Sequence, residues 1–268
     1  MQERHELSFG GRAYRVFVRP IGELPEAGWP TALILDADQF FDRAADIAEA
    51  EASPRLLVGI GLPEADVAAR IARRYFELTD HAASGTIPLR PGQEMPQTGG
   101  ERLFAGFLRW RLLPWLDEWF ALAAGRMALF GHSLAGLFVL RAFLRRELPV
   151  GDFLAADPSV WWNGHRVLAE LDAFLGAFPD HPAKDHRRLT ILAAGDGARP
   201  GLSQAEREGV DALRGGPNGL NFGARLTEAG HRRVTAASLS EETHGSIVGP
   251  ALEHFFALTG EGRTAAGR

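Results

Sequence analysis

The sequence contains no cysteine among its 268 residues. Disulfide bonds, cysteine nucleophiles and thiolate metal sites are therefore excluded. The absence of cysteine also fits a reducing compartment. The charged residues that open the sequence lack the basic start and the apolar run of a secretory signal. The cytoplasm is therefore the default expectation for the location of the protein.

Long hydrophobic runs and an excess of basic residues are also missing. No apolar run reaches the roughly 18 residues that a membrane-spanning helix requires, and the formal net charge is −5. Nucleic acids and anionic membranes favour a basic surface, so neither is expected as a partner. With 46% hydrophobic and 24% charged residues, the composition is that of a globular protein with a full core. It does not indicate the oligomeric state.

Short apolar segments alternate with longer segments of helical periodicity along most of the chain. The segments predicted to be strands are 14–18, 31–35, 56–60, 127–130, 153–156, 189–192 and 234–239. The predicted helices include 101–120, with a kink at Pro114, 134–145 and 250–258. Nearly all-apolar strands that alternate with helices predict a mostly parallel α/β sheet with helices on both faces.

No internal repeat and no linker divides the chain. We therefore predict a single domain over residues 1–268, with its core at about 12–259 and a frayed tail from 260. Two stretches, 79–100 and 195–223, have little periodicity and are rich in glycine, with prolines in both. The first is typical of a long loop, and loops of this length often form lids or binding loops.

The pentapeptide Gly131-His132-Ser133-Leu134-Ala135 lies between a predicted strand and a predicted helix. In this context a G-x-S-x-G-like turn presents its serine as a nucleophile. The helix that follows offers backbone N–H groups and a partial positive charge to a developing oxyanion. A serine at a helix start can also be an N-cap only. The preceding buried strand favours the nucleophile.

A serine nucleophile needs a histidine base, and the base is commonly held by an acid. His244, one of nine histidines, lies just beyond the last predicted strand and before the final helix. Asp196 follows the strand at 189–192 and is the candidate acid, although an ordinary Asp-Gly turn explains it equally well. Glu241 and Glu242 are the alternatives to Asp196. His132 is expected to point away from the nucleophile.

Two backbone N–H groups are candidates for an oxyanion hole. One belongs to Leu134, directly after the nucleophile. The other belongs to Asp38, or to its neighbour Ala37, in the predicted loop after the strand at 31–35. The acidic side chains of this loop are expected to turn inward and to fix the loop by hydrogen bonds.

Several separated segments together resemble one known family. They are GWPTALILDAD (28–38), VGIG (58–61), RYFELT (74–79), GGERLF (99–104), FGHS (130–133), DPSVWWN (157–163) and ETHGS (242–246). In this order they are similar to the "Putative esterase" family of α/β-hydrolases, the branch that includes trilactone siderophore esterases. The resemblance implies an α/β-hydrolase fold and a serine carboxylic-ester hydrolase with Ser133 and His244 as its core pair. It implies no metal and no organic cofactor.

The resemblance also implies two substrate contacts. Arg74 would lie near the pocket and contact an acidic or polar acyl group, with an ion pair to Glu77 as the alternative. The Trp161-Trp162 pair would lie near the pocket as well. Trp161 is the candidate for stacking on an aromatic substrate, and burial in the core is the alternative.

Two positions depart from the family pattern, which usually has glycine where this chain has Ala37 and Ala135. A positive φ at either position would cost more for alanine than for glycine. The predicted function is hydrolysis of a small-molecule ester, for which a siderophore-type ester is one candidate. Thioester cleavage or acyl transfer would use the same machinery. A non-catalytic scaffold that binds a ligand or partner is the alternative from another class.

Overall fold

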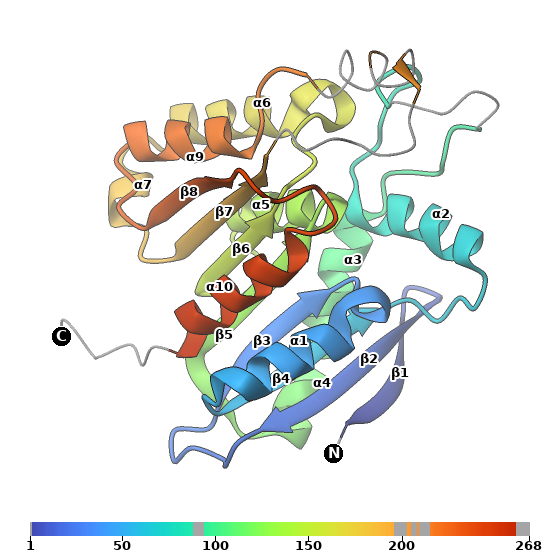
Figure 1. The fold of residues 1–268 in the computed structure, drawn as a ribbon, viewed down its shortest axis with the longest axis vertical. Helices are drawn as coiled ribbons and strands as arrows, with labels where there is room; N and C mark the ends of the chain where they lie inside the picture. The colour runs from blue at the N-terminus through green and yellow to red at the C-terminus, as the bar shows by residue number, and fades with distance from the viewer. Residues whose placement is uncertain (1, 88–93, 196–202, 205–207, 209–214, 261–268) are drawn as a thin grey trace.

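The computed structural model describes residues 2–87, 94–195, 203–204, 208 and 215–260. Its strands form one eight-stranded sheet in the order β1-β2-β4-β3-β5-β6-β7-β8 (Figure 1). They are β1 (Glu3–Phe9), β2 (Arg12–Ile21), β3 (Trp29–Leu35), β4 (Arg55–Gly61), β5 (Leu122–His132), β6 (Asp152–Ala156), β7 (Arg188–Ala194) and β8 (Val234–Leu239). From β4 to β8 all neighbours are parallel, while β1 and β2 run antiparallel at one edge. The mostly parallel α/β sheet is confirmed.

Helices cover both faces of this sheet. They are α1 (Ala37–Glu51), α2 (Val67–Leu78), α3 (Glu101–Phe107), the π-helical segment η1 (Leu108–Leu112), α4 (Leu113–Trp119), α5 (Leu134–Arg145), α6 (Trp162–Ala177), α7 (His181–Lys184), α9 (Gly219–Glu228) and α10 (Val248–Gly260). Helices α1 and α10 lie together across one face (Figure 1). Residues of α3, α5, α6 and α9 pack against the other face.

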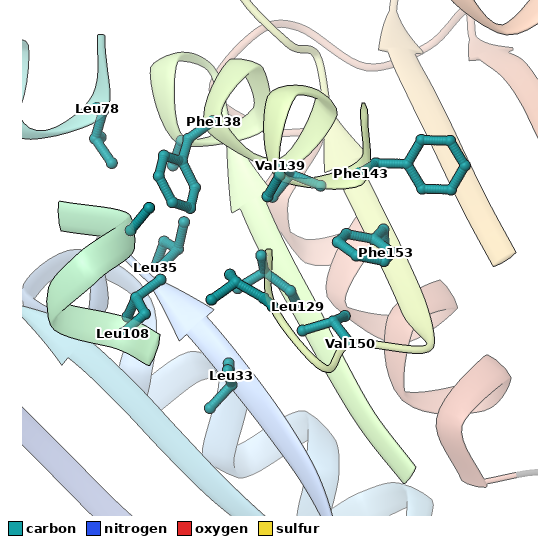
Figure 2. Close-up of a cluster of buried hydrophobic side chains, with 14 of the residues drawn as sticks. Leu33, Leu35, Leu78, Leu108, Leu129, Phe138, Val139, Phe143, Val150 and Phe153 are labelled. Carbon is teal, nitrogen blue, oxygen red and sulfur yellow. The ribbon is translucent and has the colours of Figure 1, made fainter. Parts of the chain in front are cut away.

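The strands contribute side chains to two separate hydrophobic cores, because successive side chains of a strand point to opposite faces of the sheet. Leu33 and Leu129 belong to the cluster under α5, whereas the adjacent Ile34 and Phe130 belong to the cluster under α1 and α10. Figure 2 shows the first of these clusters, where Phe138 and Val139 of α5 meet the leucines of β3 and β5. Burial on both faces explains why these strands are nearly all apolar in sequence.

Several elements differ from the sequence prediction. The predicted helix at 101–120 is divided into α3, the π-helical segment η1 and α4, which begins at Leu113. Residues 37–41, expected in a loop, form the first turns of α1. Strand β1 was not predicted, because only Leu7 of its seven residues is buried.

The two stretches without periodicity have different outcomes. In the first, the described residues 79–87 and 94–100 contain neither helix nor strand, as expected of a loop. The backbone N–H of Ala82 donates to the hydroxyl of Thr98 at 3.1 Å, which ties the two sides of this loop together. In the second, α9 begins at Gly219, inside the stretch. Among the described residues, no helix has the length and apolar character needed to span a membrane.

Candidate active site

Ser133 lies on a tight turn between the end of β5 at His132 and the start of α5 at Leu134. Its backbone has φ 60° and ψ −118°, outside the regions that are allowed for most residues with a side chain. The N–H of Ser133 donates to the carbonyl of Ala156 at 3.0 Å. A Cβ on Gly131 would come within 2.4 Å of the Ala135 carbonyl oxygen. The sequence therefore needs glycine at 131 to close the turn that presents Ser133.

The two departures from glycine do not strain the backbone. Neither Ala37 nor Ala135 has a positive φ. In the segment after β3 the positive φ, 55°, falls on Asp36 instead. Ala135 is fully buried within α5. Alanine therefore fits both positions.

Ser133, His244 and Asp157 form a continuous hydrogen-bonded chain. Nε2 of His244 lies 3.1 Å from Oγ of Ser133, and Nδ1 of the same ring lies 2.5 Å from Oδ2 of Asp157. His244 follows β8, as the sequence predicts, and Asp157 directly follows β6. The carboxyl ends of parallel strands meet at one edge of the sheet, which brings residues far apart in sequence together.

Asp157 is held as a carboxylate. Burial raises its pKa, but the hydrogen bond and the charge of His244 and the hydrogen bond from the Ala194 N–H lower it, and the net shift is downward. The Ala194 N–H donates to Oδ1 of Asp157 at 3.1 Å, which leaves Oδ2 for the imidazole. A carboxylate on Nδ1 keeps the proton on that nitrogen. Nε2 is then the atom that can accept a proton from Ser133.

The two residues predicted to form an oxyanion hole lie at helix N-termini. Leu134 is the first residue of α5, and Asp38 is in the first turn of α1. N–H groups in a first helical turn have no acceptor within the helix. The side chain of Asp38 turns inward, accepting from Arg15 at 2.7 Å and from the N–H of Leu62 at 2.5 Å. The acidic residue thus braces the turn, as expected.

Arg74 lies against the turn that carries Ser133. Its Nε donates to Oδ1 of Asp36 at 2.8 Å, and its Nη2 to the carbonyl of His132 at 3.4 Å. The alternative ion pair of Arg74 with Glu77 is not formed, because Glu77 pairs with Arg73 instead. Arg74 and Asp36 line a small cleft with Asp38, and Ser133 and His244 are not among its lining residues.

Comparisons with known proteins identify the family of the chain. The "Putative esterase" family model matches residues 11–187. The chain belongs to this family. It is 30% identical to ferri-bacillibactin esterase BesA of Bacillus subtilis over 72% of this chain and 67% of BesA. It is 29% identical to the siderophore enterobactin esterase of Emericella nidulans, over 82% of this chain and 76% of that protein.

Solved structures share the fold of this esterase. The BES protein from Bacillus cereus superposes with a TM-score of 0.77 at 24% identity, over 96% of this chain and 95% of that one. The siderophore hydrolase EstA from Aspergillus nidulans has a TM-score of 0.79 at 22% identity, over 97% and 94% of the two chains. The predicted α/β-hydrolase fold is confirmed, and the family makes the chain an ester hydrolase.

Asp196, the acid predicted from the sequence of this esterase, lies outside the described residues. The place predicted for it, on Nδ1 of His244, is taken by Asp157. Glu241 and Glu242, the alternatives, accept hydrogen bonds from neighbouring serine hydroxyls. The sequence signal that was missed is an acidic residue directly after a buried strand, one strand earlier along the chain.

The two adjacent tryptophans of the esterase have different surroundings. Trp162 is fully buried and donates its Nε1–H to Oδ1 of Asp80 at 3.1 Å, so burial in the core applies to it. Trp161 keeps part of its surface exposed, with its ring centroid 5.9 Å from that of Trp162. Trp161 is therefore the solvent-accessible member of the pair.

Two further residues of the esterase touch the hydrogen-bonded chain and were not predicted to do so. His132 was expected to point away from the nucleophile, and its Nε2–H donates to the carbonyl of His244 at 2.6 Å. Burial, followed by the charge of His244, lowers the pKa of His132 to about 4. Ser159 places its Oγ 3.3 Å from Oγ of Ser133. Its only sequence signal is its place two residues after Asp157.

Proposed function

We propose that the chain hydrolyses esters through a covalent acyl-enzyme on Ser133. Oγ of Ser133 attacks the ester carbonyl while its proton passes to Nε2 of His244, and that proton then goes to the departing alcohol. Water next attacks the acyl carbon and gives a proton to Nε2 of His244; the bond from the acyl carbon to Oγ then breaks, Oγ takes that proton, and the acid leaves. Asp157 keeps the imidazole in the required tautomer. The contact that carries this proposal is the 3.1 Å separation of Nε2 and Oγ.

In this proposal the tetrahedral oxyanion is bound by the backbone N–H groups of Leu134 and Asp38. Both groups lie at helix N-termini, where unpaired donors and the helix dipole favour negative charge. The bonds that Asp38 accepts from Arg15 and Leu62 support a fixed orientation of its turn. Donors that are already in place need no reorganisation when the charge develops.

The substrate that we propose is a small-molecule ester of the siderophore type. The names of the two relatives, an esterase of ferri-bacillibactin and one of enterobactin, support this class. Arg74 would contact an acidic or polar part of the acyl group, since its guanidinium lies 3.4 Å from the carbonyl of His132, next to Ser133. Trp161 would stack on an aromatic ring with its exposed surface.

Labelling with a fluorophosphonate tests the nucleophile. We expect one label per chain, on the peptide that contains Ser133, and parallel loss of p-nitrophenyl ester hydrolysis. The Ser133→Ala variant should lose both. Ser53→Ala is the matched control, because it removes a hydroxyl that bonds to Glu51, away from the site. Absence of both label and hydrolysis in the wild-type protein would leave a non-catalytic scaffold.

A substrate comparison tests the class of ester. The values of kcat/KM for a catechol trilactone, a simple acyl ester and the matching thioester are measured on the same preparation. We expect the trilactone to have the highest value and Arg74→Met to lower it more than that of the simple ester. A higher value for the thioester would contradict the proposed substrate while leaving the Ser133 mechanism in place.

A further inference from the structure

The turn after β6 carries Asp157 and also Ser159, a residue that contacts Ser133 and that the proposed mechanism does not use. Ser159 is 1% exposed, and its Oγ lies 3.3 Å from Oγ of Ser133. The backbone N–H of Ser159 also donates to the carbonyl of Ser133 at 3.0 Å. The same turn therefore delivers the carboxylate of Asp157 to His244 and a buried hydroxyl to the nucleophile.

The direction of the bond between the two serines follows from the position of the protons. The carboxylate of Asp157 only accepts, so Nδ1 of His244 carries its proton and Nε2 is an acceptor. The single hydroxyl hydrogen of Ser133 is then engaged by Nε2 at 3.1 Å. Oγ of Ser133 can only accept from Ser159. Ser159 is thus the donor.

We propose that Ser159 is a catalytic residue whose hydroxyl assists the departure of Oγ of Ser133 from the acyl-enzyme. This inference rests on the proposed function. In that step water attacks the acyl carbon and its proton goes to Nε2 of His244. The bond between the acyl carbon and Oγ then breaks, and the proton passes from Nε2 to Oγ. Ser159 keeps its own proton throughout and donates a hydrogen bond to the oxygen that gains charge.

Only deacylation gains from this donor. In the acyl-enzyme Oγ is an ester oxygen and a weak acceptor, and it becomes a strong one as its bond to carbon breaks. The bond from Ser159 therefore strengthens toward that transition state, which lowers the barrier. During acylation the change is reversed, because Oγ begins as a hydroxyl oxygen and ends as an ester oxygen. Donation to Oγ leaves this first step unaided.

The surrounding turn fixes Ser159 in advance. The N–H of Trp162 donates to the carbonyl of Ser159 at 3.0 Å. A Cβ on Gly136 of α5 would lie 3.1 Å from Cα of Pro158, so the turn packs tightly on the helix behind Ser133. A donor held in this way loses little entropy when the reaction begins.

Stopped-flow kinetics of p-nitrophenyl acetate hydrolysis separate the two steps. The first turnover gives the acylation rate and the later linear phase the deacylation rate. For Ser159→Ala we expect deacylation to slow by about three- to tenfold, as for the loss of one hydrogen bond, with acylation unchanged or faster. Because deacylation then limits turnover, Ser159→Ala should release a burst of p-nitrophenolate close to one equivalent per active site, as counted by fluorophosphonate labelling. Ser159→Thr, which keeps the hydroxyl, should restore deacylation.

Controls separate this inference from the proposed function. Ser53→Ala should match the wild type in both steps. An equal fall of both rates in Ser159→Ala, or no change in either, would overturn the role of Ser159 while leaving the Ser133 mechanism intact. Absence of fluorophosphonate labelling in the wild type would overturn the mechanism itself. Should the alanine variant fail to fold, Ser159→Cys, a weaker donor of similar shape, must show the same split between the steps.

Discussion

At the scale of single residues, Asp157 combines an unfavourable backbone with a defined set of partners. Its φ is 39°, in the region that favours glycine. The backbone N–H of Asp157 donates to the carbonyl of Leu192 at 2.6 Å, and its carboxylate bonds to His244 and to the N–H of Ala194. Strain of this kind persists where surrounding contacts over-determine it, which is common at functional sites.

Replacement of the acid is expected to be costly. Asp157→Asn keeps the shape but removes the charge that fixes the tautomer of His244, so kcat should fall about 10²- to 10⁴-fold with little change in KM. Steady-state kinetics of ester hydrolysis give kcat and KM for the variant and the wild type. Asp196→Asn is the matched control and should remain close to wild type. The reverse ranking of the two variants would assign the acid to Asp196.

The depressed pKa of His132 couples stability to pH. Its pKa is about 4 in the folded chain, because it is buried and lies beside His244, against about 6.5 when unfolded. Between these values the unfolded chain binds a proton that the folded chain does not. The free energy of unfolding therefore falls as the pH drops from about 6.5 to 4, by up to about 3 kcal/mol.

His132→Gln tests this linkage, because glutamine retains an N–H donor for the carbonyl of His244 and does not titrate. Urea unfolding is measured at pH 7.0, 5.5 and 4.5 for both proteins. We expect the variant to lose less stability than the wild type over this range. Parallel pH profiles would show that His132 is protonated equally in the folded and unfolded states.

At the scale of elements, a buried arginine joins α5 to its neighbours. Arg141 is fully buried and pairs with Asp80 at 2.7 Å, Glu101 at 3.1 Å and Glu170 at 2.9 Å. These acids lie on the 79–87 segment, α3 and α6. Asp80 also accepts from the indole of Trp162. One polar network thus joins α5, which begins directly after Ser133, to α3, α6 and the 79–87 segment.

Loss of this arginine should destabilise the chain strongly. Arg141→Leu leaves Glu101, whose side chain is 2% exposed, with less of the positive charge that compensates it. We expect a loss of about 3–5 kcal/mol in the free energy of unfolding. Arg102→Leu is the control, because its pair with Glu147 is solvent-exposed and worth about 1 kcal/mol or less. Similar losses in both variants, by urea unfolding, would contradict this ranking.

The elements differ in how far the sequence predicts them. Helix α5 has the bounds expected, because its apolar segment starts directly after a buried strand and ends at basic residues. Helix α1 has an apolar stripe of mostly small residues, from Ala37 through Phe41 to Ala48, and its start was assigned to the loop after β3. Strand β1 has a single buried side chain, so its alternation is too weak to be recognised.

At the scale of the whole molecule, alternating strands and helices determine which edge of the sheet carries the site. They do not determine which side chains meet there. Asp157 and Asp196 both follow parallel strands, β6 and β7, which are neighbours in the sheet. Sequence order alone cannot rank them. His244 follows β8 but its ring contacts Ser133 at the end of β5, and β6, which Asp157 follows, is the neighbour of β5. The proximity of Ser133 and His244 could be predicted, and the contacts of Asp157 and Ser159 with them could not.

The sheet order also separates stability from catalysis. Strand β1 lies at the edge, with β2, β4 and β3 between it and β5, and Leu7, 4% exposed, is its buried anchor. Leu7→Ala should lower the free energy of unfolding by about 2–5 kcal/mol and leave kcat per fluorophosphonate-labelled site unchanged. Glu6→Ala, exposed on the same strand, should change neither. Loss of kcat in the folded Leu7→Ala protein would mean that the antiparallel edge helps to position Ser133, four strands away in the sheet order.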